Sequence, residues 1–469
     1  MEEYVNKKLK QFNKEIEGKR VAIIGIGVSN IPLLEYFYKL NCFISVFDNR
    51  EKNEIDKQIL EIIEKYKIRT YLGKGNLKFL YDYDYIFRSP SCRPDIPEIE
   101  AEVQKGAILT SEIEQVIRLT PSTVIGVTGT EGKTTTTSLI TAILKKGGKR
   151  VFLGGNIGTP LFDKIGEMKK EDYVVLELSS FQLFKMDYNP HIAVVTNMMP
   201  DHLNVHTSMQ EYIDSKKNIF NKQNEDDILV INYDNQITKE FYKDANGKVR
   251  YFSHKTLLDD GAIFDEQDKT IKLCDDGIRK HLLKQKDMIL RGEHNCENAC
   301  AAILATLGIV SLDDAVSAIE EFSPVEHRLE FVRKINDIEW YNDSICTSPA
   351  SVIAGINSFE ENIVLIAGGY DKGLDYTEIA KPIINKVSKL ILMGDTADKI
   401  EKAVNDELEK QNKVLPIYRC SSLDEVVNKA TEVAVEGEVV LFSPASASFD
   451  MFKNFADRGN KFKAVVNSK

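Results

Sequence analysis

The strongest chemical signal in the sequence is Gly126-Val-Thr-Gly-Thr-Glu-Gly-Lys-Thr-Thr135, which lies between an apolar run and a helical pattern. Its glycines let backbone N–H groups approach phosphate oxygens, and the start of a helix favours negative charge. Lys133 can reach the β- and γ-phosphates, and the hydroxyl of Thr134 can bind Mg²⁺. The usual phosphate loop has glycine where this chain has Val127, so a partial motif predicts a nucleotide-phosphate site.

Acidic and imidazole side chains follow two further apolar runs that are typical of strands. Glu177 lies in the run Tyr173–Leu178, and Asp201 and His202 follow the run Ile192–Thr196. The carboxyl ends of parallel strands meet at one edge of a sheet, where ligands bind in such folds. Carboxylate and imidazole groups are ligands for divalent metals. We therefore expect Glu177 to bind Mg²⁺ and the cluster with Asp201 and His202 to suit a divalent metal beside the phosphate loop.

Two adjacent lysines, Lys216 and Lys217, lie in the helical pattern that follows this cluster. Two lysines on the protein surface would give the same pattern, and the spacing of the residues gives no reason to assign a function to either one. Residue types alone leave the role of both lysines open.

A second glycine-rich turn lies near the N-terminus, where Gly25-Ile-Gly-Val-Ser-Asn30 follows a predicted strand. Asp48 ends the next predicted strand, as in a dinucleotide-binding fingerprint. Asn30 replaces the third glycine of that fingerprint, which weakens the case for NAD. The pattern therefore favours a different nucleotide.

The elements that must position these residues alternate between short apolar, β-branched runs and amphipathic helical patterns. Such alternation predicts an α/β fold with parallel sheets. We expect three domains: a Rossmann-like N-terminal domain over 1–115, a central P-loop ATPase domain with a mostly parallel sheet over 116–323, and a Rossmann-like C-terminal domain over 324–469. Asn-Gly and Asp-Gly pairs between Asp234 and Arg291 predict hairpins that extend the central sheet. The expected strands are Arg20–Ile24, Phe43–Phe47, Tyr85–Phe87, Thr123–Thr128, Tyr173–Leu178, Ile192–Thr196, Ile228–Ile231, Ile363–Ala367, Lys389–Met393 and Val439–Ser443.

Composition excludes several classes of function. The net charge is −11 and no basic stripe with interleaved aromatics is visible, so nucleic acid is not an expected partner. The N-terminal segment is polar, and no run approaches the roughly 20 apolar residues of a membrane span. The seven cysteines form no C-x-x-C pair, which is typical of reduced thiols. We expect a cytoplasmic protein.

The phosphate loop is one of an ordered series of motifs that covers nearly the whole chain. The others are Gly155-Asn-Ile-Gly158, Glu177-Leu-Ser-Ser-Phe-Gln182, Asp201-His202, His294-Asn295 and the long run Ser443–Gly459. Together they resemble the Mur ligase family of peptidoglycan synthesis. The run Ser443–Gly459 is similar to members of that family that add D-glutamate.

The resemblance implies one reaction shared among the three domains. The N-terminal domain holds the UDP of the sugar substrate, the central domain holds ATP, and the C-terminal domain brings D-glutamate. ATP phosphorylates the carboxylate of UDP-N-acetylmuramoyl-L-alanine, and the amine of D-glutamate then forms an amide. Two Mg²⁺ ions are implied, the partners are small molecules, and we expect a monomer.

The resemblance also assigns roles to individual residues. Lys216, rather than Lys217, matches a lysine that becomes carbamylated, which converts a cation into an anionic oxygen ligand. The catalytic set is Lys133, Lys216, His202 and Glu177, and the metal set is Thr134, Glu177, His202 and carbamylated Lys216. The ATP-binding set is Gly129, Thr130, Gly132, Lys133, Thr134, Thr135, Asn295, Arg328 and Asp343. The UDP-binding set is Val28, Ser29, Asp48, Arg50, Ser89 and Asn156, and the D-glutamate set is Thr347, Lys372, Ser448, Phe449 and Phe455.

Two positions depart from the family pattern. Ile345 stands where many relatives have a lysine near the transferred phosphate, and Ser91 stands where relatives have glycine. The first departure leaves open how the phosphate is stabilised. The second concerns only how the loop at the uracil-diphosphate site bends.

Three other functions are compatible with parts of the sequence. Folylpolyglutamate synthase shares the central architecture but lacks the N-terminal block from Gly25 to Asp48. A regulatory module that binds ATP without turnover does not explain why five residues suited to catalysis occur together, namely Lys133, Glu177, His202, Lys216 and Lys372. A nicotinamide dehydrogenase offers no role for the phosphate loop.

Overall fold

The computed structural model describes residues 6–201, 205–323 and 326–469. The chain forms two compact units, one made of Met1–Leu283 with Glu297–Ile319 and the other of Lys284–Cys296 with Glu320–Lys469. The first expected domain and most of the second belong to the first unit, whereas residues 284–296 and 320–323 of the expected central domain belong to the second unit. The boundaries of the three domains stay a prediction. Within the described residues, no helix is long and apolar enough to cross a membrane.

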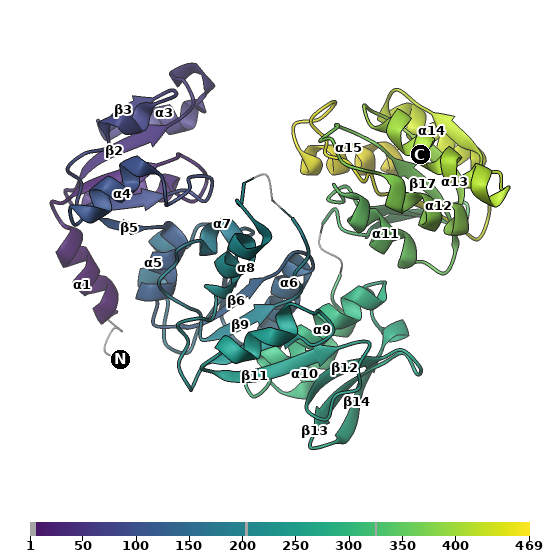
Figure 1. The fold of residues 1–469 in the computed structure, drawn as a ribbon, viewed down its shortest axis with the longest axis horizontal. Coiled ribbons are helices and arrows are strands. Elements are labelled where there is room, and N and C mark those ends of the chain that lie inside the picture. Colours follow the sequence, from purple (N-terminus) through teal and green to yellow (C-terminus); the bar gives the residue numbers. More distant parts are fainter. Residues whose placement is uncertain (1–5, 202–204, 324–325) are drawn as a thin grey trace. The chain divides into compact units, whose positions relative to one another are not determined.

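The N-terminal part is a parallel five-stranded sheet with the order β3-β2-β1-β4-β5 (Figure 1). Its strands are β1 (Arg20–Ile24), β2 (Phe43–Asp48), β3 (Arg69–Leu72), β4 (Tyr85–Arg88) and β5 (Ile108–Thr110), and its helices are α1 (Lys7–Ile16), α2 (Ile31–Lys39), α3 (Lys57–Lys65) and α4 (Pro97–Gln104). Strand order reverses at β1, which places the ligand crevice at the carboxyl ends of β1 and β4.

The central part contains a nine-stranded sheet with the order β14-β13-β12-β11-β10-β9-β6-β8-β7. Its strands are β6 (Thr123–Thr128), β7 (Val151–Gly155), β8 (Tyr173–Glu177), β9 (Ile192–Val195), β10 (Ile228–Asn232), β11 (Lys248–Ser253), β12 (Gly261–Asp265), β13 (Thr270–Asp275) and β14 (Ile278–Lys284). Its helices are α5 (Glu112–Leu119), α6 (Lys133–Lys146), α7 (Ser180–Leu183), α8 (Met209–Lys217), α9 (Glu293–Thr306) and α10 (Leu312–Glu320). The five strands from β10 to β7 pair with their neighbours in parallel.

The antiparallel extension of the central sheet is confirmed for β12 and β13, but the hairpins predicted at Asn246-Gly247 and Asp260-Gly261 are wrong, because β11 pairs in parallel with both β10 and β12. Strands β12 and β13 pair antiparallel, and β14 follows β13 after the two residues Asp276 and Gly277. Both residues have positive φ, at 47° and 76°, which is the geometry of a type I′ hairpin turn.

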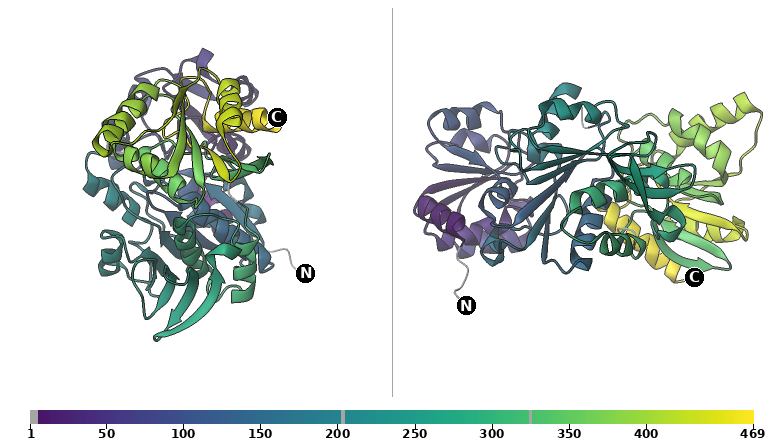
Figure 2. Two further views of the ribbon diagram at one scale, coloured as in Figure 1. Left: turned by 90° about the vertical axis from the view of Figure 1, so that its right-hand side faces the viewer. Right: turned by 90° about the horizontal axis from the view of Figure 1, so that it is seen from below.

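The C-terminal sheet has the order β15-β16-β20-β17-β18-β19 and is parallel apart from the hairpin of its first two strands. Its strands are β15 (Glu330–Ile335), β16 (Ile338–Asn342), β17 (Asn362–Ala367), β18 (Val387–Leu392), β19 (Ile417–Arg419) and β20 (Glu438–Phe442), and its helices are α11 (Pro349–Asn357), α12 (Ala380–Lys386), α13 (Ala397–Gln411), α14 (Leu423–Val433) and α15 (Phe455–Asn467). The left view of Figure 2 shows helices on both sides of this sheet. Two separate hydrophobic clusters accordingly cover its two faces.

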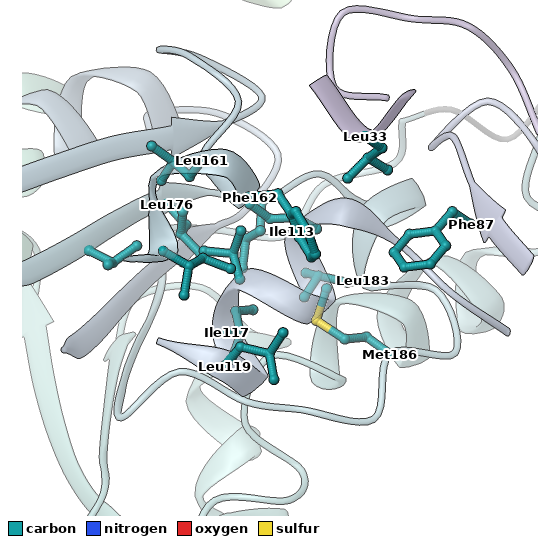
Figure 3. Packing of buried hydrophobic residues seen from close by; sticks show 14 of the residues in the cluster. Leu33, Phe87, Ile113, Ile117, Leu119, Leu161, Phe162, Leu176, Leu183 and Met186 are labelled. Carbon is teal, nitrogen blue, oxygen red and sulfur yellow. The ribbon is translucent and has the colours of Figure 1, made fainter. Parts of the chain in front are cut away.

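One hydrophobic core continues from the N-terminal sheet into the central part. Phe162 begins the short 3-10 helix η3 (Phe162–Glu167) and is almost fully buried. Its ring centre lies 4.9 Å from that of Tyr36 and 5.9 Å from that of Phe12, and both pairs meet edge to face. Figure 3 shows Phe162 among neighbouring apolar side chains of this core. A central residue thus fills the aromatic core of the N-terminal part.

The buried carboxyl group of Glu112 fixes the backbone of this segment. Its Oε1 accepts hydrogen bonds from the backbone N–H groups of Leu161 and Phe162, both at 2.9 Å. Burial raises the pKa of Glu112 to about 7, although the two N–H groups oppose the shift. Glu112 therefore anchors η3 from inside an apolar environment.

We predict that Phe162→Ala lowers the free energy of unfolding by about 3–5 kcal/mol, because it leaves a cavity lined by aromatic rings. The shift of the urea midpoint measures this loss. Phe43→Ala is the control, since Phe43 is 69% exposed and its removal should cost below about 0.5 kcal/mol. Equal shifts for the two variants would contradict a shared core.

Candidate active site

A glycine-rich loop joins β6 to the N-terminus of α6, as the sequence predicts. Gly129 has φ 144° and Gly132 has φ 79°. A Cβ at Gly129 would lie 1.9 Å from Thr196 Oγ1, and one at Gly132 would lie 2.4 Å from Asn298 Oδ1. Only glycine fits either position, so the loop turns tightly and its N–H groups lie at the start of a 14-residue helix. This arrangement is an anion site.

The segment after β9 supports the loop from the side. The Asn197 carbonyl accepts from Thr130 N–H at 2.9 Å, and its side-chain Oδ1 accepts from Glu131 N–H at 2.9 Å. Lys133 Nζ donates to the Thr130 carbonyl at 2.8 Å. The sequence analysis assigns no role to Asn197, because the contact joins segments 66 positions apart.

Glu177 ends β8 and is almost fully buried beside the helix start. Its Oε2 accepts from Thr134 Oγ1 at 2.7 Å, and its Oε1 accepts from Asn156 Nδ2 at 2.7 Å. The structure therefore brings together Thr134 and Glu177, a hydroxyl and a carboxylate of the kind that Mg²⁺ prefers. The expected ligand His202 lies outside the described residues.

Lys216, on α8, is buried against the phosphate loop, whereas Lys217 is paired with Asp244 nearer the surface. Lys216 Nζ donates to the Gly129 carbonyl at 2.7 Å and lies 4.9 Å from the centre of the Tyr212 ring. Burial lowers the pKa of Lys216 well below its ordinary value, and the nearby charge of Lys133 adds to this. A lowered pKa favours the neutral amine, which is the form that reacts with CO₂ to give a carbamate.

A cavity of 520 Å³ lies at the carboxyl edge of the N-terminal sheet, where strand order predicts a ligand. Asp48 Oδ2 accepts from Ile26 N–H at 2.8 Å and also pairs with Arg50. Burial acts to raise the pKa of Asp48, but hydrogen bonds from Arg50 and Ile26 prevail and lower it to about 2.

Three of the residues expected at UDP line this cavity, namely Asp48, Arg50 and Ser89. Val28 is exposed, and Asn156 contacts Glu177 rather than the cavity wall. Ser91 adds a hydroxyl to the wall and lies 3.0 Å from Ser89 Oγ.

In the C-terminal sheet, Thr347, Lys372 and Ser448 follow the carboxyl ends of β16, β17 and β20, which are neighbours. Phe449 is 61% exposed, and its ring meets that of Tyr370 edge to face at 6.0 Å. The structure therefore places four of the residues expected at D-glutamate in loops at one edge of this sheet. The fifth, Phe455, starts α15 and contacts His327.

Two of the expected nucleotide contacts of the second unit, Asn295 and Asp343, are buried, and Arg328 is half-buried. Asp343 accepts from Ser443 Oγ at 2.7 Å and from Leu329 N–H at 3.2 Å. Arg328 has a buried Nε that finds no hydrogen-bond partner among the described residues. Asn295 donates to the Arg291 carbonyl at 2.7 Å.

Arg458, to which the sequence analysis gives no role, is the most deeply buried cation of the second unit's described residues. Its guanidinium donates to the carbonyls of Ser344, Ser446 and Ala447 at 2.8–3.0 Å. Burial lowers its pKa to about 10. Arg458 therefore holds the loops after β16 and β20 together, and no local sequence pattern reveals this.

Three family models match successive parts of the chain. They describe a Mur ligase MurD-like N-terminal domain over residues 19–111, a Mur ligase middle domain over residues 127–306 and a Mur ligase glutamate ligase domain over residues 327–446. The UDP-N-acetylmuramoylalanine--D-glutamate ligase of Acetivibrio thermocellus is 48% identical over 466 residues, or 99% of each chain. The protein of the same name from Clostridium tetani is 44% identical over 99% of this chain and 100% of its own.

Solved structures share the fold at low identity. MurF from Acinetobacter baumannii has a TM-score of 0.61 at 16% identity and covers 99% of each chain. The UDP-N-acetylmuramate-alanine ligase MurC from Thermotoga maritima has a TM-score of 0.59 at 20% identity, over 96% of this chain and 99% of its own. Both matches support the same three-domain α/β architecture.

We predict that Gly129→Ala weakens ATP binding at least about 10-fold, because the new methyl group collides with Thr196 and displaces the loop. Isothermal titration with a non-hydrolysable ATP analogue measures the change. Gly148→Ala is the matched control: Gly148 also has positive φ, at 73°, but a Cβ there meets no atom within 4 Å. Equal affinities in the two variants would count against a phosphate site at this loop.

Proposed function

The chain belongs to the Mur ligase family, and on that premise we propose that it joins D-glutamate to UDP-N-acetylmuramoyl-L-alanine, converting ATP to ADP and phosphate. The family and fold expected from the sequence motifs are confirmed. One observation carries the proposal: the phosphate loop, the Thr134–Glu177 pair and the buried amine of Lys216 meet in one place.

The first step activates a carboxylate, which is a poor electrophile by itself. The alanyl carboxylate attacks the γ-phosphorus of ATP, ADP leaves, and an acyl phosphate results. Loop N–H groups and Lys133 hold the γ-phosphate in line and offset its charge, which is how proteins promote phosphoryl transfer. Mg²⁺, when bound by Thr134 and Glu177, supplies further positive charge against the phosphate oxygens.

The second step forms the amide. The amine of D-glutamate, after losing its ammonium proton, attacks the acyl carbon, and phosphate leaves with the electron pair of the broken C–O bond. Lys372 provides a cation for the side-chain carboxylate of D-glutamate, and Thr347, Ser448, Phe449 and Phe455 surround the amino acid.

The remaining residues bind the two nucleotides. Asp48, Arg50 and Ser89 hold the UDP group with Val28 and Ser29, and Asn156 acts from beside Glu177. Asn295, Arg328 and Asp343 contact ATP together with the phosphate-loop residues. The buried Asp343 and the unpaired Nε of Arg328 support this role in polar recognition.

Lys216 acts as a carbamate that ligates metal with Glu177 and His202. A lysine with a lowered pKa is suited to this modification, and its position against Gly129 brings the modified group close to the phosphates. Two Mg²⁺ ions, a monomeric state and a cytoplasmic location complete the proposal.

Phosphate release tests the proposed function directly. Purified protein with Mg-ATP and UDP-N-acetylmuramoyl-L-alanine should release phosphate with D-glutamate and at least about 10-fold more slowly with L-glutamate, D-aspartate, L-lysine or no amino acid. Lys133→Ala should reduce release at least about 100-fold, because it removes phosphate positioning. Release that depends on another amino acid would reject D-glutamate as substrate, and no release would reject a ligase.

The carbamate is tested by replacing its lysine. Lys216→Ala should lose at least about 100-fold in kcat, and added acetate should restore part of it, because a short carboxylate can take the place of the carbamate oxygens. Lys217→Ala is the control and should keep wild-type activity, since Lys217 pairs with the exposed Asp244 and lies over the ring of Phe241. Fully active wild-type protein with an unmodified Lys216 in its mass spectrum would contradict the role.

A further inference from the structure

Four polar side chains form a continuous chain of contacts behind the phosphate loop. Arg93, in the loop after β4, pairs with Glu211 on α8 at 2.9 Å. Glu211 Oε1 lies 3.2 Å from His206 Nδ1, and His206 Nε2 lies 2.9 Å from Ser180 Oγ. Ser180 is the first residue of α7. The chain therefore links the N-terminal part to two helices of the central part.

The charges of these groups fix the direction of the hydrogen bonds. Burial lowers the pKa of His206, which favours the neutral imidazole. The pKa of Glu211 is lowered to about 2, mainly by its hydrogen bonds with Arg93, so Glu211 is ionised and can only accept. Nδ1 of His206 therefore donates to Glu211, and Nε2 accepts from the Ser180 hydroxyl. Each of the four polar side chains therefore has a hydrogen-bond partner in the next one.

His206 also packs against Tyr212, which contacts both the phosphate loop and Lys216. Its ring centre lies 5.3 Å from that of Tyr212, and its other side stacks on Phe181 at 5.2 Å. Tyr212 in turn contacts both Thr130, with its hydroxyl 3.1 Å from Thr130 Oγ1, and Lys216, whose Nζ lies over the ring. His206 therefore packs directly on the residue that contacts both Lys216 and the phosphate loop.

The other end of the chain lies at the expected UDP site. Arg93 lines the 520 Å³ cavity of the N-terminal sheet, beside Ser91. Its guanidinium also donates to the Val205 carbonyl at 2.8 Å, immediately before His206. A ligand that fills the cavity contacts the same arginine that orients Glu211.

We propose that His206 is a positioning residue that, through Arg93 and Glu211, makes the placement of Lys216 and Thr130 depend on whether the UDP cavity is filled. The inference rests on the proposed function for the identity of the ligand. It deepens that function, because ATP is then held more tightly when the sugar nucleotide is present. The proposed coupling between the two sites is carried by a series of adjoining contacts and does not depend on one bond.

The experiment measures the affinity for a non-hydrolysable ATP analogue with and without UDP-N-acetylmuramoyl-L-alanine. Wild-type protein should bind the analogue at least about 5-fold more tightly with the sugar nucleotide present. Arg93→Ala and His206→Leu should reduce that ratio to within about 2-fold of unity, and His206→Gln, which keeps polar atoms in the ring's place, should restore at least half of it. A structural role alone would lower the folded fraction and leave the ratio unchanged.

The matched control is Lys185→Ala. Lys185 pairs with Glu100 at 3.2 Å, so it also joins the N-terminal and central parts, but both side chains are about half exposed. This variant should keep the wild-type ratio. Arg93→Ala combined with His206→Leu should cause no larger loss than either change alone, because both break one network.

The outcomes separate the inference from the proposed function. A wild-type ratio of about 1, or an unchanged ratio in Arg93→Ala, overturns the inference whatever the turnover. Coupled binding without D-glutamate-dependent phosphate release supports the inference and rejects the proposed function. If His206→Leu does not fold, Glu211→Gln takes its place in the comparison, because Glu211 lies at the less buried end of the chain of contacts.

Discussion

The close approach of the loop at Gly129 to Thr196 is the constraint on which the rest of the site depends. There is no space for a side chain there, so the loop lies directly against the segment that follows β9. The backbone carbonyl of Gly129 accepts a hydrogen bond from Lys216, and the hydroxyl of the neighbouring Thr130 contacts the hydroxyl of Tyr212. The phosphate loop, the Thr134–Glu177 pair and the amine of Lys216 can lie in one small volume because no side chain at Gly129 fills it.

A second constraint is the core that the N-terminal and central parts share. Phe162 fills an aromatic pocket formed by the N-terminal part, and Arg88 donates to the carbonyls of Phe181 and Phe184 beside α7. Burial of apolar side chains supplies most of the stability, and the buried Arg88 fixes the position of the segment that contains Phe181 and Phe184. The cavity at the edge of the N-terminal sheet and the phosphate loop are therefore built on one framework.

The sequence predicts the parts of the site that follow a strand and precede a helix. The loop at Lys133 and the acid Glu177 are found because a β-strand, a glycine-rich turn and a helix leave clear local patterns. The hairpin at Asp276 and Gly277 is predicted for the same reason. Strands β3, β5 and β19 have only 4, 3 and 3 residues, which is too short to give such a pattern.

Other features depend on contacts between distant segments. Spacing could not decide between Lys216 and Lys217, and only the resemblance to a family selected the residue that proves to be buried. Arg93 and Glu211 lie 118 positions apart, so no window of sequence joins them. Arg458 looks like any helical surface residue until the two loops that it binds are placed beside it. Tertiary burial, and not residue type, distinguishes these side chains.

The buried carboxyl group of Glu112 has a consequence for how folding responds to acid. Its ordinary pKa of 4.5 applies when the chain is unfolded, and the folded value is about 7. Between these two values the folded protein holds a proton that the unfolded chain releases, so folding is accompanied by proton uptake. The contribution of this group to stability is greatest below pH 4.5, declines as the pH rises to 7 and is constant above it. The dry core that joins the two parts of the chain is thus also a proton-linked element.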